Sequence, residues 1–136
     1  MQATEPDAKV LDGSCLCGAV KFEVIGDIPE LYSCHCSICR KATGAAANAA
    51  FCLPPEKFRW LGGDPEIKTW IRETGYRNDF CPQCGSSVPN PLRGGDGFWC
   101  PAGLLNGPTG SKIANHYCVA SKADFDVIAG DAPQHD

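Results

Sequence analysis

The chain has 136 residues, of which 43% are hydrophobic, so it can bury one modest core and is short for two domains. Its net charge of −4 leaves no broad basic surface, which argues against nucleic acid or anionic lipid as a partner. The first seven residues are polar and acidic, and no segment is long and apolar enough to span a bilayer. We therefore expect one soluble, cytoplasmic domain over residues 1–136, with its core at about 13–134.

Short strands and turns are predicted along the chain, because glycine and proline are scattered and leave no window for a long helix. Val20, Phe22 and Val24 alternate with two charged residues, which is the period of a strand with one buried face. This strand is expected at residues 19–25. Similar but shorter strands are expected at residues 57–61, 67–71, 76–80, 97–100, 116–119 and 125–128. The predicted fold class is mainly β, a sandwich or tent of small sheets with short helical turns.

Two segments depart from this pattern. Residues 39–44 are compatible with a short helical turn that ends at Gly44, a residue suited to the left-handed conformation. The alanine-rich residues 45–50 have helical propensity, but they lead into Phe51 in the manner of a strand. We expect a strand there.

Ten cysteines indicate either a disulfide framework or metal ligands, and a reducing cytoplasm favours metal. Cys81 and Cys84 form a Cys-x-x-Cys knuckle followed by Gly85, in which a tight turn aims both sulfur atoms at one point. A structural zinc takes four ligands, and Cys15 and Cys17 offer two more on one face of an extended segment. These four residues are predicted to form a Cys₄ zinc site.

Three alternatives remain for these four thiols. They could be buried as small hydrophobic side chains, or they could form two disulfides. A redox-active Cys-x-x-Cys needs a thioredoxin-like βαβ context, which the sequence does not show.

A second cluster places Cys34, Cys36 and Cys39 within six residues, without an obvious fourth ligand nearby. An open coordination position distinguishes a catalytic zinc from a structural one. If a helix starts at Cys39, its dipole and the adjacent Arg40 and Lys41 favour the thiolate. We therefore predict a second zinc, held by three thiolates and open to a thiol substrate.

Other residues compete for the fourth position. His35 is one, although a residue between two i, i+2 ligands faces the other way in an extended segment. Cys52, Cys100 and Cys118 could also close the site, but each stands alone among apolar or strand-like neighbours. Buried structural cysteine is the expected state of these three.

Three motifs, in this order and spacing, resemble the glutathione-dependent formaldehyde-activating enzyme family: Gly-Ser-Cys-Leu-Cys-Gly-Ala-Val at 13–20, Cys-His-Cys-Ser-Ile-Cys-Arg-Lys at 34–41 and Phe-Cys-Pro-Gln-Cys-Gly-Ser at 80–86. Residues 116–122 and 130–134 resemble the closing segment of the family. Phe125 stands where the family often has tryptophan, and we expect it to remain an aromatic core residue. The resemblance thus covers nearly the whole chain.

The resemblance implies a β-tent fold with two Zn²⁺ ions, one structural on Cys15, Cys17, Cys81 and Cys84, and one catalytic on Cys34, Cys36 and Cys39. It also implies a carbon–sulfur lyase that joins glutathione and formaldehyde as S-hydroxymethylglutathione. Both substrates are small molecules, and the thiol would enter the open site, lose its proton and attack the aldehyde.

Glutathione carries two carboxylates, so its pocket should present cations, and motif position suggests Arg40, Lys41, Arg93 and Lys122. His116 is a candidate for proton transfer, although a histidine at the start of a strand is more often structural. Two alternatives are a non-catalytic carrier of glutathione or another small thiol, and an interaction adaptor in which both zinc sites are structural.

Overall fold

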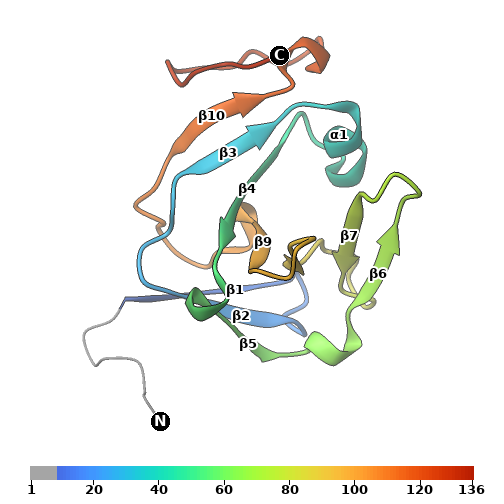
Figure 1. Ribbon diagram of the computed structural model, residues 1–136, viewed down its shortest axis with the longest axis vertical. Coiled ribbons are helices and arrows are strands. Elements are labelled where there is room, and N and C mark those ends of the chain that lie inside the picture. Colours follow the sequence, from blue (N-terminus) through green and yellow to red (C-terminus); the bar gives the residue numbers. More distant parts are fainter. Residues whose placement is uncertain (1–8) are drawn as a thin grey trace.

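The computed structural model describes residues 9–136, and the sequence-based expectation for residues 1–7 lies outside this range. Strands make up most of the regular secondary structure of the described residues, with a single α-helix, α1 (Ser37–Thr43), which confirms the predicted class. No helix in this part of the chain has both the length and the apolar composition needed to cross a membrane. Figure 1 shows the strands grouped in separate small sheets, with α1 at one edge of the molecule and β1, β2 and β5 at the opposite end.

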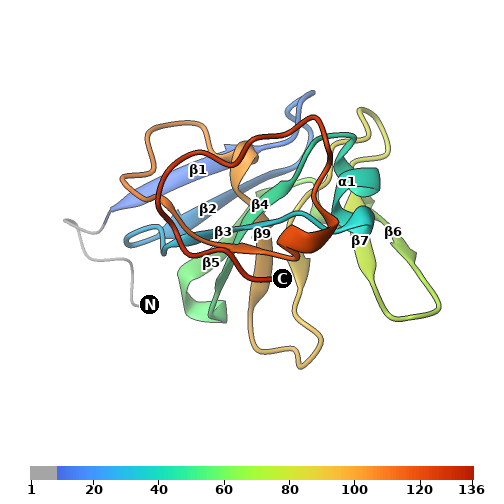
Figure 2. The same cartoon turned by 90° about the horizontal axis from the view of Figure 1, so that it is seen from above.

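Two of the sheets lie on either side of the main core (Figures 1 and 2). A three-stranded antiparallel sheet has the order β1-β2-β5, with bounds β1 (Val10–Ser14), β2 (Lys21–Ile25) and β5 (Phe58–Gly62). A five-stranded sheet has the order β10-β3-β4-β9-β8, in which only β10 and β3 are parallel neighbours. Its bounds are β3 (Leu31–Cys34), β4 (Asn48–Leu53), β8 (Asn90–Pro91), β9 (Phe98–Pro101) and β10 (Ile113–Tyr117).

The third sheet is a hairpin of β6 (Lys68–Ile71) and β7 (Arg77–Phe80). Side chains alternate across a strand, so each face of this hairpin presents a different set. Ile71 and Arg77 share one face with Asp79, and Trp70 and Asn78 share the other. The hairpin therefore separates two regions of the surface.

The core forms where the two larger sheets face each other. Phe22 and Val24 of β2 pack with Phe51 of β4, and all three are at most 1% exposed. The Phe58 ring stacks on Phe98 with centroids 4.1 Å apart. Fully burying one such side chain contributes about 1.5–3 kcal/mol, so this cluster stabilises the packing of one sheet on the other.

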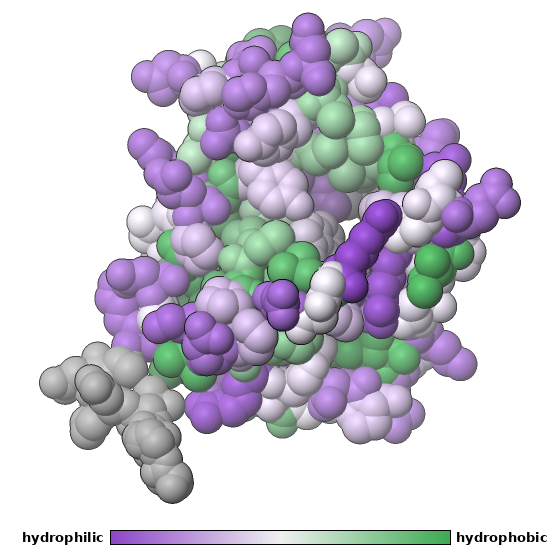
Figure 3. Space-filling view, in the orientation of Figure 1, coloured by the Kyte–Doolittle hydropathy of each residue, from purple (hydrophilic) through white to green (hydrophobic). Residues whose placement is uncertain are grey.

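The five-stranded sheet has a second face that does not enter this core. The register pairs Cys34 with Asn48 and Asn90 with Trp99. These side chains lie on the face of the sheet that points away from the Phe51 side chain. Figure 3 shows apolar surface in the middle of the molecule between hydrophilic rims. The sheet thus has one face for the core and another for a potential site.

Several strand predictions are confirmed within one or two residues, but residues 125–128 are not a strand. The Asp126 N–H donates to the Ala123 carbonyl in a turn, and Phe125 and Val127 are 77% and 86% exposed. Their apolar alternation therefore has no sheet to pack on. The expectation that Phe125 is a core residue is wrong for the same reason.

Strand β10 ends earlier than predicted, because Cys118 adopts the left-handed conformation at φ 57° and a 3₁₀ turn, η4 (Val119–Ser121), follows. Of the alanine-rich residues 45–50, only 48–50 are in a strand. The predicted helix end is confirmed: Gly44 has φ 66° and its N–H donates to the Arg40 carbonyl.

Candidate metal centres and thiol cavity

The first thiol cluster joins two distant parts of the chain. Cys15 and Cys17 lie between β1 and β2, and Cys81 and Cys84 directly follow β7. The four sulfur atoms all lie within 4.8 Å of one another. The predicted strand geometry at Cys15 and Cys17 is wrong, because the Gly18 N–H donates to the Cys15 carbonyl and closes a turn there. That turn still aims both thiols at the knuckle.

The spacing of these sulfur atoms fits a metal better than a disulfide. Zinc holds sulfur at about 2.3 Å in a tetrahedron, which separates the ligand atoms by roughly 3.8 Å. The Sγ atoms of Cys15 and Cys17 are 3.7 Å apart, and those of Cys17 and Cys81 are 3.8 Å apart. All ten cysteines are free of disulfides. This cluster could therefore hold a zinc ion.

A backbone N–H and a hydroxyl lie beside two of these sulfur atoms, those of Cys15 and Cys84. The Val20 N–H lies 3.3 Å from the Cys15 sulfur, and the Ser86 hydroxyl lies 3.2 Å from that of Cys84. Hydrogen bonds from the Ser86 side chain and backbone lower the pKa of Cys84 to about 5. Donors that favour the thiolate are what a thiolate-bound metal requires.

The second cluster is local. Cys34 ends β3, Cys36 is the N-cap of α1 and Cys39 lies in its first turn, with their sulfur atoms within 4.8 Å of one another. The sequence-based hypothesis that the helix starts at Cys39 is wrong, because the N-cap residue is Cys36. The Cys36 sulfur accepts a hydrogen bond from the Cys39 N–H at 3.4 Å. Burial, and then the neighbouring Cys34 and Cys36 thiols, raise the pKa of Cys39. All three thiols can be ionised together only with a cation between them, so this cluster could hold a metal ion.

His35 points away from the three thiols, as expected for a residue between two i, i+2 ligands. Its Nε2 lies 3.0 Å from Nδ1 of His116, and both residues are buried. The Nδ1 atom of His35 is buried without a hydrogen-bond partner among the described residues, with a carboxylate oxygen of Asp126 4.0 Å away. His116 is therefore a buried partner of His35.

The three remaining cysteines differ from one another. Cys100 is fully buried beside Phe51, as predicted, whereas Cys52 is exposed and Cys118 is intermediate. The alternation in β4 puts Phe51 and Leu53 in the core and turns Cys52 to the other face. The expectation of burial is thus wrong for Cys52, and Cys118 is only half-buried.

A cavity of about 550 Å³ opens beside the second cluster, within the roughly 300–1,000 Å³ that is usual for small-molecule sites. Cys34 and Cys39 line it, whereas none of the four thiols of the first cluster does. The other lining residues come from β3, β4, β9 and the two segments around β6–β7 and β8: Tyr32, Asn48, Ile71, Gly75, Tyr76, Arg77, Asn90, Pro91, Leu92, Arg93 and Trp99.

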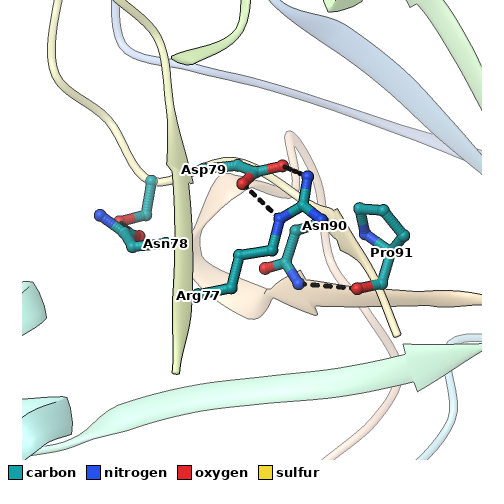
Figure 4. Close-up of polar contacts among 6 residues, drawn as sticks. Arg77, Asn78, Asp79, Asn90 and Pro91 are labelled. Atoms are coloured by element: carbon teal, nitrogen blue, oxygen red, sulfur yellow. Dashed lines mark hydrogen bonds and ion pairs between the residues drawn. The ribbon is translucent and has the colours of Figure 1, made fainter. Parts of the chain in front are cut away.

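Two polar contacts fix the orientation of side chains in the cavity wall. The Trp99 indole N–H donates to the Tyr32 hydroxyl at 2.7 Å. Arg77 donates through Nε and Nη2 to the carboxylate of Asp79, at 2.8 and 3.1 Å. Figure 4 shows this guanidinium held against Asp79, with Asn90 beside it.

The four cations suggested from motif position lie in different places. Arg93 lines the cavity, and Lys41 lines a separate hollow between α1 and the hairpin. The Lys122 ammonium donates to the Asp126 carbonyl at 2.9 Å. The Nε atom of Arg40 is buried and has no hydrogen-bond partner among the described residues.

Sequence reasoning did not single out Arg77, although a signal was present. Arg77 and Asp79 are i, i+2 residues of a predicted strand, and opposite charges in that relation share a face and can pair. Tyr32 and Asn48 were also missed, because their place beside Cys34 depends on the pairing of β3 with β4.

The family model for the glutathione-dependent formaldehyde-activating enzyme matches residues 10–121, most of the chain and both thiol clusters. The chain belongs to this family. A Halomonas elongata protein, named provisionally as such an enzyme, is 49% identical over 41 residues, which are 29% of this chain and 26% of that protein. An uncharacterized lyase of Schizosaccharomyces pombe is 23% identical over 114 residues, 83% of this chain and 81% of that protein.

A crystal structure of a Rhodobacter sphaeroides protein has a similar fold. Its TM-score is 0.58 at 21% sequence identity, over 75% of this chain and 98% of that chain. This likeness supports the fold, and membership of the family makes an enzyme acting on glutathione and formaldehyde the natural hypothesis.

Proposed function

We propose that this member of the family joins glutathione to formaldehyde and forms S-hydroxymethylglutathione. The observation that carries the proposal is the cavity itself: two thiols of the Cys34–Cys36–Cys39 cluster line it, whereas no thiol of the other cluster does, although Cys17 there is exposed to solvent. A catalytic metal needs an open position, whereas a structural one is enclosed by its protein ligands.

The two clusters would each hold a zinc ion. Cys15, Cys17, Cys81 and Cys84 supply four ligands for a structural ion, and Cys34, Cys36 and Cys39 supply three for a catalytic one. Zinc with three protein ligands leaves one position for an incoming thiol and lowers the pKa of that thiol. The nucleophile would be the sulfur of the substrate.

Side chains of the cavity would position the reactants. Asn48 is the cross-strand partner of Cys34 and is 8% exposed, so its amide offers a fixed polar contact beside the thiols. Arg93, as the cationic candidate in the cavity wall, would attract a carboxylate of glutathione. Arg40, Lys41 and Lys122 remain candidates for contacts outside the cavity.

Tyr32 is suited to donate a hydrogen bond to the aldehyde oxygen. Burial raises the pKa of Tyr32 to about 12, so the phenol stays protonated at neutral pH. Its oxygen accepts from Trp99, which leaves its own O–H available to the cavity. As the carbon–sulfur bond forms, negative charge develops on the aldehyde oxygen, and a fixed donor stabilises it.

The test combines metal analysis with binding and rate measurements. The zinc-loaded protein should bind glutathione in a calorimetric titration and accelerate hemithioacetal formation above the uncatalysed rate. Cys36→Ser should lose both properties. Because serine can also cap a helix, this variant removes a ligand while preserving the start of α1.

Each outcome selects one function. Glutathione binding without acceleration would support a thiol carrier and contradict the enzyme. A second metal that is already four-coordinate without thiol, together with no glutathione binding, would identify an adaptor with two structural sites.

A further inference from the structure

The cavity beside Cys34 and Cys39 has an excess of positive charge. Arg77 and Arg93 are its charged lining residues, and no carboxylate is among the described residues that line it. The whole chain has a net charge of −4, so this excess is a local property. Apart from the thiols that would hold the metal, the charged side chains of the wall are both cations, and they attract an anionic ligand.

Arg77 is oriented before any ligand arrives. Asp79 is 4% exposed and accepts from Nε and Nη2 of Arg77, which fixes the plane of the guanidinium. A guanidinium has five N–H donors, and Asp79 uses two of them. The Arg77 side chain lines the cavity and is 35% exposed, so it can offer a ligand donors that Asp79 does not use. A fixed planar donor suits a carboxylate, because little side-chain entropy is lost on binding.

Arg93 adds positive charge that is not neutralised by a partner. It follows β8, and it packs on the turn of the β6–β7 hairpin: a Cβ added to Gly75 would lie 2.8 Å from its Nη2. No carboxylate pairs with Arg93 within residues 9–136. Arg77 thus supplies oriented donors, and Arg93 adds positive charge that offsets the charge of Asp79 beside Arg77.

We infer that Arg77 and Arg93 form a carboxylate-binding subsite, which makes the cavity selective for thiols that carry a carboxylate. As a statement about substrate selection, the inference rests on the proposed function. Glutathione offers two such groups, the glycine carboxylate and the α-carboxylate of its glutamyl residue. Conversion of the engaged carboxylate to an amide should weaken binding ~10- to 100-fold, as expected for charge-assisted hydrogen bonds.

The experiment measures thiol binding by calorimetry with glutathione and with its two mono-amides. One amide should bind ~10- to 100-fold more weakly than glutathione, which identifies the engaged carboxylate. In Arg77→Gln this discrimination should fall to within about 3-fold, because the amide of glutamine lacks the charge. Arg59→Gln is the matched control, since Arg59 pairs with Glu23 on β2 and does not line the cavity.

A second variant controls for possible misfolding of Arg77→Gln. Arg77→Gln leaves the buried Asp79 without its partner, which is strongly destabilising in general. The double variant Arg77→Gln/Asp79→Asn replaces the ion pair with two amides that can hydrogen-bond to each other. It should lose the same discrimination while circular dichroism shows the fold retained.

A probe without a free thiol separates this inference from the proposed function. S-methylglutathione keeps both carboxylates but cannot ionise at sulfur, and its binding can be followed through the Trp99 indole N–H signal in the cavity. Wild-type protein should bind it, and both Arg77 variants should bind it at least ~10-fold more weakly.

The outcomes are distinct. Binding of S-methylglutathione that depends on Arg77, with no acceleration by glutathione, would sustain the subsite and reject the enzyme. Acceleration by glutathione with equal affinity for acid and amides, unchanged in the variants, would reject the subsite and sustain the enzyme. Absence of binding by every probe would reject both.

Discussion

The two thiol clusters use the same side chain in opposite ways. The four-thiol cluster connects the β1–β2 turn to the segment after β7, so it constrains residues that are more than 60 positions apart. The three-thiol cluster lies between the end of β3 and the first turn of α1 and opens into a cavity. The sequence span of a cluster therefore predicts its contribution to folding, and the cavity beside it predicts its contribution to chemistry.

The largest expected effect is on the four-thiol cluster. Cys81→Ser should abolish cooperative folding, because structural zinc sites contribute about 10–16 kcal/mol of binding free energy, comparable to the whole stability of a domain. Thermal unfolding followed by circular dichroism measures this. Removal of metal with a strong chelator should have the same effect on the wild-type protein.

A folded Cys81→Ser protein with an unchanged melting temperature would contradict the structural role. Cys36→Ser provides the comparison, because it removes a thiol from the local cluster. Its melting temperature should change much less, since no distant segments are held together there.

The second prediction concerns access. With Co²⁺ in place of zinc, both clusters should give thiolate-to-metal absorption, but added glutathione should perturb only the part that is missing in Cys36→Ser. Metal analysis should show about two ions per chain in the wild-type protein and about one in Cys36→Ser. If glutathione alters the spectrum of Cys36→Ser as well, the four-thiol cluster is also open, and the contrast between the clusters fails.

Sequence reasoning predicted this contrast because ligand spacing is a local property. The knuckle at Cys81 and the three thiols after Tyr32 are visible in consecutive residues, and so is the period of β2. The cavity wall was less accessible. Asn48 and Trp99 reach it through strand pairing, and pairing register cannot be read from a single strand.

The wrong strand predictions at Phe125 and Cys118 also arise because local sequence does not reveal tertiary context. Phe125 has the composition of a strand residue, but its neighbours form a turn and no sheet edge receives it. Cys118 ends β10 because its backbone adopts φ 57°, a conformation that local sequence rarely reveals in a residue other than glycine.

The third prediction concerns the buried His35–His116 pair beside the three-thiol cluster. His116→Ala removes the hydrogen-bond partner of the buried His35, which lies between two of the predicted ligands. An unsatisfied buried polar group costs about 1–3 kcal/mol, so urea unfolding should show a loss of that size. His135→Ala is the control: His135 is exposed and bonds to Asn115, and its loss should cost less than about 0.5 kcal/mol. Equal effects of the two changes would show that the buried pair has no special contribution.

The smallest effect is expected at Cys52, the exposed cysteine of β4 that belongs to neither cluster. Cys52→Ser should leave unfolding free energy within about 0.5 kcal/mol of wild type, because the side chain is not packed in the core. The variant is informative for the metal analysis, because Cys52 is on the same face of the sheet as Cys34 and is an alternative fourth ligand. Metal content, glutathione affinity and the Co²⁺ spectrum should all stay at wild-type values. A loss of one ion in this variant would mean that Cys52 closes the second cluster, which would then be structural like the first.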